Sequence, residues 1–215
     1  MAQIFPKWTN KLPLYIVIGV IFGGLATVGF FWYYGSPKYT DVGYRPVQPV
    51  EYSHKLHAGD LGMDCRYCHT SVEISEEAII PPTQTCMNCH TLIRTESEKL
   101  LPVRESWSTG DPIQWVRVHN LPDFAYFKHN AHVRAGIGCE SCHGNVAAME
   151  VVEQKEPLSM SWCIDCHRNP EPFIRPHSDI TKMNWKPPAN QFEFARRVID
   201  EKKIKPPVDC SGCHR

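Results

Sequence analysis

The 215-residue sequence predicts one membrane-spanning helix followed by a mainly helical and irregular domain with little β structure. Three features support this prediction: an uncharged apolar stretch near the amino terminus, ten cysteines that all fall into one repeated motif, and eighteen prolines that interrupt the rest of the chain. After the apolar stretch, neither the helical nor the strand period is sustained for long. Such a chain would bury only a thin core unless cofactors filled its interior.

Residues 12–34 contain no charged side chain and are long enough to cross a hydrocarbon layer of about 30 Å as one helix. Lys7 and Lys11 precede them, and no acidic residue occurs before Asp41. By the positive-inside rule, the amino terminus lies in the cytoplasm and the main domain on the other side of the membrane. The sequence therefore predicts a single-pass protein of the inner membrane with a periplasmic domain.

A cleavable signal peptide is the alternative for this stretch. Its apolar core would be shorter, and small residues in an Ala-x-Ala arrangement would follow it; neither is present. We therefore expect an uncleaved anchor. The anchor contains no Asp, Glu, His, Lys or Arg, so we expect it to act as a tether that takes no part in the chemistry. Gly19 and Gly23 would let a partner helix approach it closely.

Each of the five Cys-x-x-Cys pairs is followed directly by histidine. The motifs are Cys65, Cys68 and His69; Cys86, Cys89 and His90; Cys139, Cys142 and His143; Cys163, Cys166 and His167; Cys210, Cys213 and His214. This motif attaches c-type haem, because the thiols bond to the edge of the ring and the histidine becomes the proximal iron ligand. Structural zinc sites and redox disulfides also use Cys-x-x-Cys pairs, but neither requires the histidine. The sequence thus predicts a multihaem cytochrome c with five covalently bound haem c groups.

Two similar short sequences, called histidine words below, each contain a further pair of histidines. They read Tyr52-Ser-His54-Lys-Leu-His57 and Phe127-Lys-His129-Asn-Ala-His132. Each word precedes two haem motifs, which indicates a two-haem module used twice. Side chains on one helical turn are neighbours, so they cannot bind opposite faces of the same flat ring. The two histidines of each word should therefore serve two different haems.

By proximity in sequence, we expect His54 to be the distal ligand of the first haem and His129 that of the third. His57 and His132 should reach neighbouring haems that the sequence does not identify. For the fifth distal ligand, His119 and Met183 are equally supported, with His177 behind them. Methionine ligation would raise the potential of that haem.

These features divide the chain into six parts. They are residues 1–11, the cytoplasmic amino terminus; 12–34, the anchor; 35–50, a linker; 51–118, the first two-haem module; 119–180, the second; and 181–215, a segment with the fifth haem. A helix is expected at about 190–204. The fifth motif then ends near the last residue, so its haem should be exposed or covered by another subunit.

The chain has enough candidate axial ligands to bind each haem iron on both faces, which favours electron transfer over substrate binding. We therefore expect an electron-transfer subunit that is not catalytic by itself. The 23 basic and 23 acidic side chains balance, and no basic cluster indicates nucleic acid.

The His-x-x-His words ahead of Cys-x-x-Cys-His resemble those of the cytochrome c3 and c7 families. The whole chain, with its anchor, five motifs and the stretch Ile80-Pro-Pro-Thr-Gln-Thr-Cys86-Met-Asn-Cys89-His90, resembles the pentahaem subunit of bacterial alternative complex III. That resemblance implies an iron–sulfur subunit as electron donor, integral subunits that bind quinol, and a monohaem cytochrome c or terminal oxidase as acceptor. Two alternatives are a stand-alone quinol dehydrogenase of the NapC/NrfH kind and a haem-based reductase.

Overall fold

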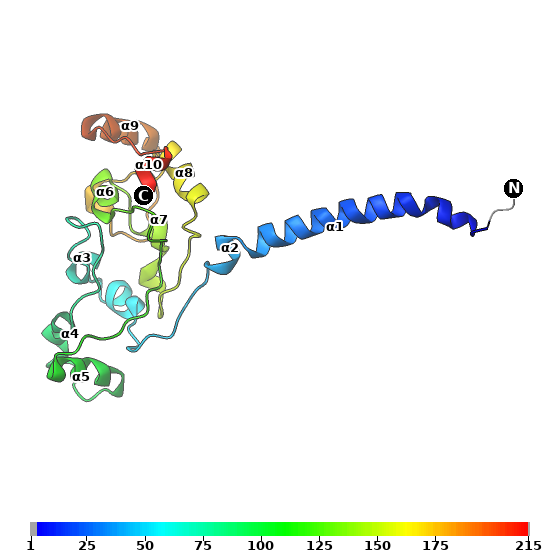
Figure 1. The fold of residues 1–215 in the computed structure, drawn as a ribbon. Helices are drawn as coiled ribbons and strands as arrows, with labels where there is room; N and C mark the ends of the chain where they lie inside the picture. The colour runs from blue at the N-terminus through cyan, green and yellow to red at the C-terminus, as the bar shows by residue number, and fades with distance from the viewer. Residues whose placement is uncertain (1–3, 215) are drawn as a thin grey trace. The chain divides into compact units, whose positions relative to one another are not determined.

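The computed structural model describes residues 4–214, which form two compact units divided between Asp41 and Val42. The first unit contains a short 3₁₀ turn, η1 (Lys7–Lys11), the long helix α1 (Leu12–Tyr34) and the single turn α2 (Pro37–Thr40) (Figure 1). The bounds of α1 are those of the uncharged stretch.

Helix α1 buries none of its residues within the protein. In the described part of the chain it is the one helix long and apolar enough to cross a membrane. Aromatic rings gather at its carboxyl end, where the ring of Tyr34 lies 4.7 Å from those of Phe30 and Tyr39. A row of apolar side chains without protein neighbours is what a candidate membrane anchor presents to lipid.

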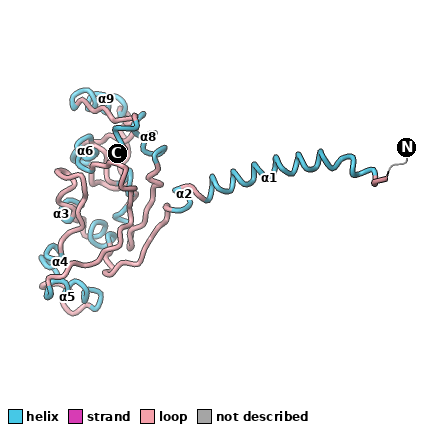
Figure 2. The backbone as a smooth tube through the Cα atoms, viewed as in Figure 1, coloured by secondary structure: helices cyan, strands magenta, loops and turns pink. Residues whose placement is uncertain are grey.

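The second unit consists of short helices and turns joined by irregular segments (Figure 2). Its elements are η2 (Lys55–Asp60), α3 (Cys65–Cys68), α4 (Thr83–His90), η3 (Glu98–Leu100), α5 (Leu101–Thr109), α6 (His129–Ala135), α7 (Glu140–His143), η4 (Val146–Ala148), α8 (Met160–Arg168), η5 (His177–Asp179), α9 (Gln191–Lys202) and α10 (Cys210–Cys213). Between residues 4 and 214 there is no strand, and two isolated bridges join Ala125 to His214 and Ile137 to Ile174. The prediction of a mainly helical and irregular domain is confirmed.

The apolar core of this unit is small. Its largest fully buried side chains are Ile174, Ile180 and Val103. Large apolar side chains are exposed elsewhere, such as Leu92 at 88% and Ile74 at 74%. Burial of apolar surface is the main favourable term in folding, so this chain obtains little of it from its own side chains.

Two buried polar residues hold the segment after α8 in place. The Arg175 guanidinium donates from Nη1 to the Lys182 carbonyl at 3.0 Å and lies 4.7 Å from the centre of the Trp185 ring. The Gln191 amide, at the start of α9, donates to the carbonyls of Glu171 and Ile174, both at 2.6 Å. Helix α9 itself lies within the range expected for it.

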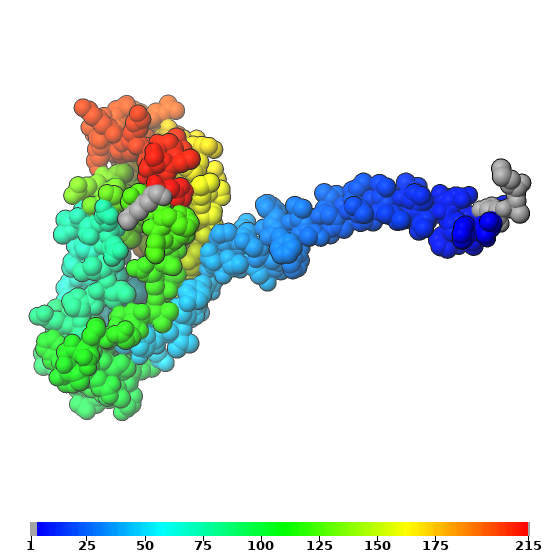
Figure 3. Space-filling model, in the orientation of Figure 1, coloured from blue at the N-terminus to red at the C-terminus, as the bar shows by residue number. Residues whose placement is uncertain are grey.

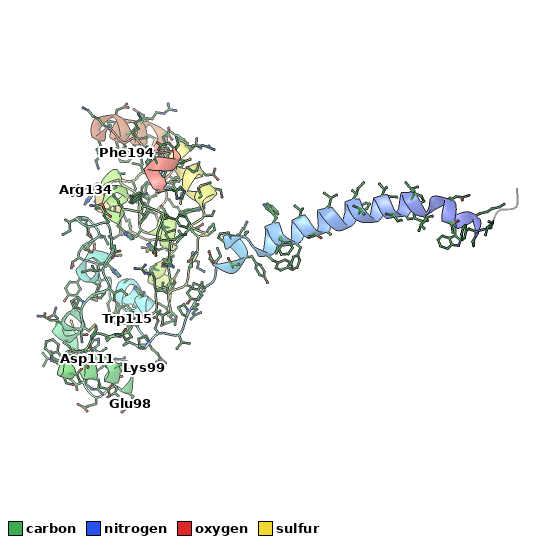
Figure 4. All side chains as sticks on the ribbon, viewed as in Figure 1. Glu98, Lys99, Asp111, Trp115, Arg134 and Phe194 are labelled. Carbon is green, nitrogen blue, oxygen red and sulfur yellow. The ribbon has the colours of Figure 1, made fainter. Side chains whose placement is uncertain are left out.

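The helices are arranged as a series along the second unit. In the ribbon and in the space-filling view, α4 and α5 lie at one end, α3 lies next to them, and α8, α9 and α10 lie at the other end (Figures 1 and 3). Glu98 and Asp111 mark the first end, and Arg134 and Phe194 mark the second (Figure 4). The haem motifs are distributed along this series.

Gly136, directly after α6, packs closely against the segment that contains Ile174 and Arg175. Its φ is +96°, and a Cβ there would lie 2.7 Å from the Arg175 carbonyl oxygen. Gly110 is a matched control, because its φ is +81° but no atom lies within 4 Å of the position of a Cβ. Both Gly→Ala changes should cost about 1–2 kcal/mol from the left-handed conformation. Gly136→Ala should cost more because of the clash; equal losses in thermal unfolding of the haem-loaded protein would contradict the packing described.

Candidate functional site

Each Cys-x-x-Cys-His motif lies on a short helical turn. The first is α3, the second ends α4, the third is α7 with Cys139 as its N-cap, the fourth lies in α8 and the fifth is α10. A helical turn places residues three apart on one face, so both sulfurs of a motif point the same way and the histidine follows at once. All ten cysteines are free thiols.

Side chains at the N-caps fix two of these turns. Asp64 accepts a hydrogen bond from the Arg66 N–H at 2.8 Å at the start of α3, and Asp209 accepts one from the Gly212 N–H at 2.9 Å at the start of α10. The Asp64 carboxylate also accepts from the Arg66 guanidinium at 2.9 Å, and these hydrogen bonds lower the pKa of Asp64 to about 2. Capping of this kind satisfies the free N–H groups of the first turn.

The two histidine words have the same local geometry. The Tyr52 ring stacks on His57 with centroids 4.5 Å apart and meets His54 edge-on at 4.7 Å. Phe127 stacks on His132 at 4.6 Å and meets His129 edge-on at 4.7 Å. The aromatic residue of each word therefore orients both of its imidazoles, which supports the duplication inferred from the sequence.

Three histidines of these words lie opposite motif histidines. Ring centroids are 6.3 Å apart for His57 and His90, 6.4 Å for His129 and His143, and 5.9 Å for His132 and His167. Metal–imidazole bonds of about 2.0–2.1 Å place two imidazoles on opposite sides of one metal with centroids about 6.3–6.5 Å apart. The separations of His57 from His90 and of His129 from His143 fit one iron between the rings, and His132 and His167 lie slightly closer together than this range.

Backbone carbonyls hold the other ring nitrogen of most of these histidines. The Nδ1 atoms lie 2.7–2.9 Å from a carbonyl oxygen in His57, His69, His90, His129, His132 and His167. An Nδ1–H that donates to a carbonyl leaves Nε2 unprotonated, which is the tautomer that binds a metal. The chain thus presents six imidazoles in the ligating form.

His54 lies in a buried position near the first motif. Burial, with a contribution from the charge of His69, lowers the pKa of His54 to about 4. Its Nδ1 is buried without a hydrogen-bond partner in the described part of the chain. A neutral imidazole with an orphaned nitrogen in this position fits a ligand site better than a structural hydrogen-bond site.

His119 lies against the third motif rather than the fifth. Its Nε2 is 3.3 Å from Nδ1 of His143, and the two ring centroids are 4.4 Å apart. Burial lowers the pKa of His119, and burial together with the neighbouring histidines lowers the pKa of His143 to about 3. With both rings neutral, the His143 Nδ1–H donates to His119, in the place that a carbonyl takes at other motifs.

The remaining ligand candidates lie apart from one another. Met183 lines a cavity of about 530 Å³ with Trp185 and Phe194. His177 is half exposed, 3.4 Å from the Glu73 carboxylate. His214 has the Phe124 ring 5.8 Å away, and no histidine or methionine contact to it occurs among residues 4–214.

The residues around the motifs fit haem c. None of the ten cysteines forms a disulfide, three pairs of imidazoles lie at or near the separation of two ligands on one iron, and the described residues bury few large apolar side chains. A cavity of about 350 Å³ is lined by Cys166, His167 and His132 together with apolar side chains. Arg134 and Lys205 also line it, and their charges suit the propionates of a haem.

Comparison with known proteins agrees with this assignment. Residues 125–215, which carry the third to fifth motifs, match the family described as cytochrome c7 and related cytochrome c. The comparisons relate the chain to multihaem cytochromes c, a class that binds haem c covalently.

One curated relative extends the similarity beyond that region. The chain is 27% identical over 177 residues to the multiheme cytochrome c subunit of menaquinone reductase from Nitratidesulfovibrio vulgaris. The alignment covers 72% of this chain and 78% of the relative.

The structure adds two features that sequence reasoning did not reach. It brings His57 to the second motif and His132 to the fourth, which the sequence left undecided. It also places His119 behind His143, for which the sequence carries no signal because the contact spans 24 positions.

The Asp64 cap should make stability depend on pH. Because the pKa of Asp64 falls from 3.8 to about 2 on folding, its contribution is present above pH 4 and is lost as the pH falls towards 2. Asp64→Asn should remove that acid dependence and lower the melting temperature at pH 7. Asp60→Asn is the control, since Asp60 has no hydrogen bond or ion pair in the part of the chain described; an identical acid profile for Asp64→Asn and the unmodified protein would refute the role.

Proposed function

We propose that this protein is a membrane-anchored pentahaem cytochrome c that relays electrons within a quinol-oxidising respiratory complex, of the kind called alternative complex III. The observation that carries the proposal is the set of three histidine pairs with centroids 5.9–6.4 Å apart. Imidazoles on both faces leave no open position on an iron, which suits electron transfer and not substrate binding.

The ligand assignments follow from these pairs. His57, His129 and His132 are the proposed distal ligands of the second, third and fourth haems, opposite His90, His143 and His167. His54 is the proposed distal ligand of the first haem, opposite His69. For the fifth haem, bound through Cys210, Cys213 and His214, the sequence candidates are His119, Met183 and His177. Because His119 lies against His143 of the third motif, Met183 and His177 are the proposed donors.

Haem c at each site supplies reversible one-electron chemistry of its iron. The protein residues hold that chemistry in place: thiols fix the ring edge, imidazoles occupy both faces, and carbonyls fix the imidazole tautomers. Hydrogen bonds to the ligating imidazoles also make them more basic, which tunes the potential. No residue of the chain is assigned to proton transfer or substrate binding.

The proposed partners are the other subunits of such a complex. Because α1 has no ionisable side chain, quinol would bind to separate integral subunits, and an iron–sulfur subunit would supply electrons. A monohaem cytochrome c or a terminal oxidase would accept them. The amino terminus is proposed to lie in the cytoplasm and the haem domain in the periplasm.

A second candidate has the electrons flowing in the opposite direction. It is favoured by the relative from Nitratidesulfovibrio vulgaris, which is named as a subunit of a menaquinone reductase. In that case the chain would deliver electrons towards the quinone-binding subunits.

A complex purified from its native membrane in mild detergent separates the two candidates. If quinol analogues reduce the haems of this subunit and a cytochrome c then reoxidises them, the first candidate holds. Reduction of the haems by an external donor, followed by menaquinone reduction but no quinol oxidation, would favour the second. Isolated subunit that oxidises quinol without partners would contradict both.

The orientations of the imidazoles predict distinct spectra. The ring planes of His129 and His143 differ by 8°, and those of His57 and His90 by 68°. Parallel planes split the two iron d orbitals that interact with the ligand π systems, whereas nearly perpendicular planes leave them almost equal in energy. His129→Ala should therefore remove a rhombic low-spin EPR signal, and His57→Ala a highly anisotropic one.

Each of these variants should gain a high-spin signal while keeping its full covalent haem content by mass spectrometry. Glu201→Ala is the control, because Glu201 is exposed on α9 and its side chain has no hydrogen bond or ion pair in the part of the chain described. Unchanged low-spin signals in either histidine variant would remove that histidine from the ligand set.

A further inference from the structure

The spatial order of the five motifs differs from their order in the sequence. The first link joins the second motif to the first. His57 lies opposite His90, while His54, three residues earlier, lies near His69. The Asn88 amide, inside the second motif, donates to the Tyr67 hydroxyl, inside the first, at 3.2 Å.

The second link joins the first motif to the third. Hydrogen bonds tie the segments that flank these two motifs to each other. Two contacts fix this junction: the Thr181 hydroxyl donates to Asp64 at 3.1 Å, and the carbonyl of the preceding Ile180 accepts from the Cys139 N–H at 3.0 Å. The loop after the first motif also holds His129 through the Glu76 carbonyl, 2.9 Å from its Nδ1.

The third link joins the third motif to the fourth through α6. His129 lies opposite His143, and His132, one turn later, lies opposite His167. Residues three apart on a helix have Cβ atoms about 5–6 Å apart, so the two irons that they serve must be neighbours.

The fourth link joins the fourth motif to the fifth. The Nδ1 of His167 is 2.7 Å from the carbonyl oxygen of Pro207, three residues before Cys210. No hydrogen bond or ring contact joins the second motif to the third, fourth or fifth within residues 4–214.

We propose that the five haem sites form one unbranched series in the order second, first, third, fourth, fifth. The two modules meet head to head where hydrogen bonds join Asp64 to Thr181 and Cys139 to Ile180, and this meeting point of the motifs that begin with Cys65 and Cys139 is called the Cys65–Cys139 junction. The ends of the series are the site of Cys86 and Cys89 next to α5, and the site of Cys210 and Cys213 next to α8 (Figure 1).

This inference rests on the proposed function, because only an electron relay gives the order a meaning. The terminal sites are then the two places where partner proteins exchange electrons with the chain, and the Cys65–Cys139 junction is the passage that every electron must use. The functional ends are therefore the second site, which is the last site of the first module, and the fifth site, which follows the second module.

A cryo-EM structure of the haem-loaded complex tests the order directly. The four shortest iron–iron distances should join the second site to the first, the first to the third, the third to the fourth and the fourth to the fifth. If the nearest neighbours of the first iron are any pair other than the second and third, the order is wrong. Absence of haem iron would instead defeat the proposed function itself.

Redox titration gives an independent test in solution. Methionine ligation raises the potential of a haem, and a change in the oxidation state of one haem shifts its neighbours through Coulomb interaction. His57→Met, at a terminal site, should shift the EPR-detected potential of one further site, the first. His54→Met, at an inner site, should shift two, the second and third.

The second and third signals are assigned by His57→Ala and His129→Ala, and the first by His54→Ala. Glu201→Ala again serves as the control. Equal haem content in both methionine variants shows that they are folded and loaded. A shift at the fourth or fifth site in His54→Met without one at the third would overturn the series.

Discussion

The structure depends on one geometric constraint: a flat ring takes its two axial ligands from opposite faces, whereas one helical turn presents its side chains on a single face. A pair of histidines three residues apart must therefore be shared between two rings. His129 and His132 on α6 show this directly, since they face His143 and His167 respectively. The rest of the second unit is arranged to bring a motif to each side of such a pair.

This constraint explains why long helices and sheets are missing from the described part of the second unit. Each helix that carries a haem motif needs to present one cysteine pair and then turn away, so four to nine residues are sufficient. Polypeptide between the turns supplies carbonyls for the Nδ1 atoms, as Ile79 does for His69 and Pro207 for His167. Irregular backbone is suited to this task because its carbonyls are not used in a helix or sheet.

The sequence alone was sufficient for every feature that is local. It predicted α1 from a run of uncharged residues, a helix at about 190–204 where α9 lies, and the five thiol pairs from their spacing. It also predicted that His54 and His57 serve different haems, because that follows from the geometry of one turn.

It did not identify the partners of His57 and His132. Those partners depend on how remote segments meet, and no local pattern encodes the meeting of residues 33 or 35 positions apart. The sequence did not indicate the position of His119 either, because its contact with His143 also joins remote segments. Carbonyl acceptors have no sequence signature at all, since every residue carries one.

The scarcity of buried apolar side chains bears on how this protein is made. Val103, Ile174 and Ile180 are too few to collapse a nascent chain of this size, so the polypeptide should emerge from the translocation machinery as a loose coil. Its thiols are then accessible to the enzymes that attach haem, and compaction follows ligation instead of preceding it. Maturation is thereby ordered by the composition of the chain, and a molecule that misses one attachment step is left exposed to proteases.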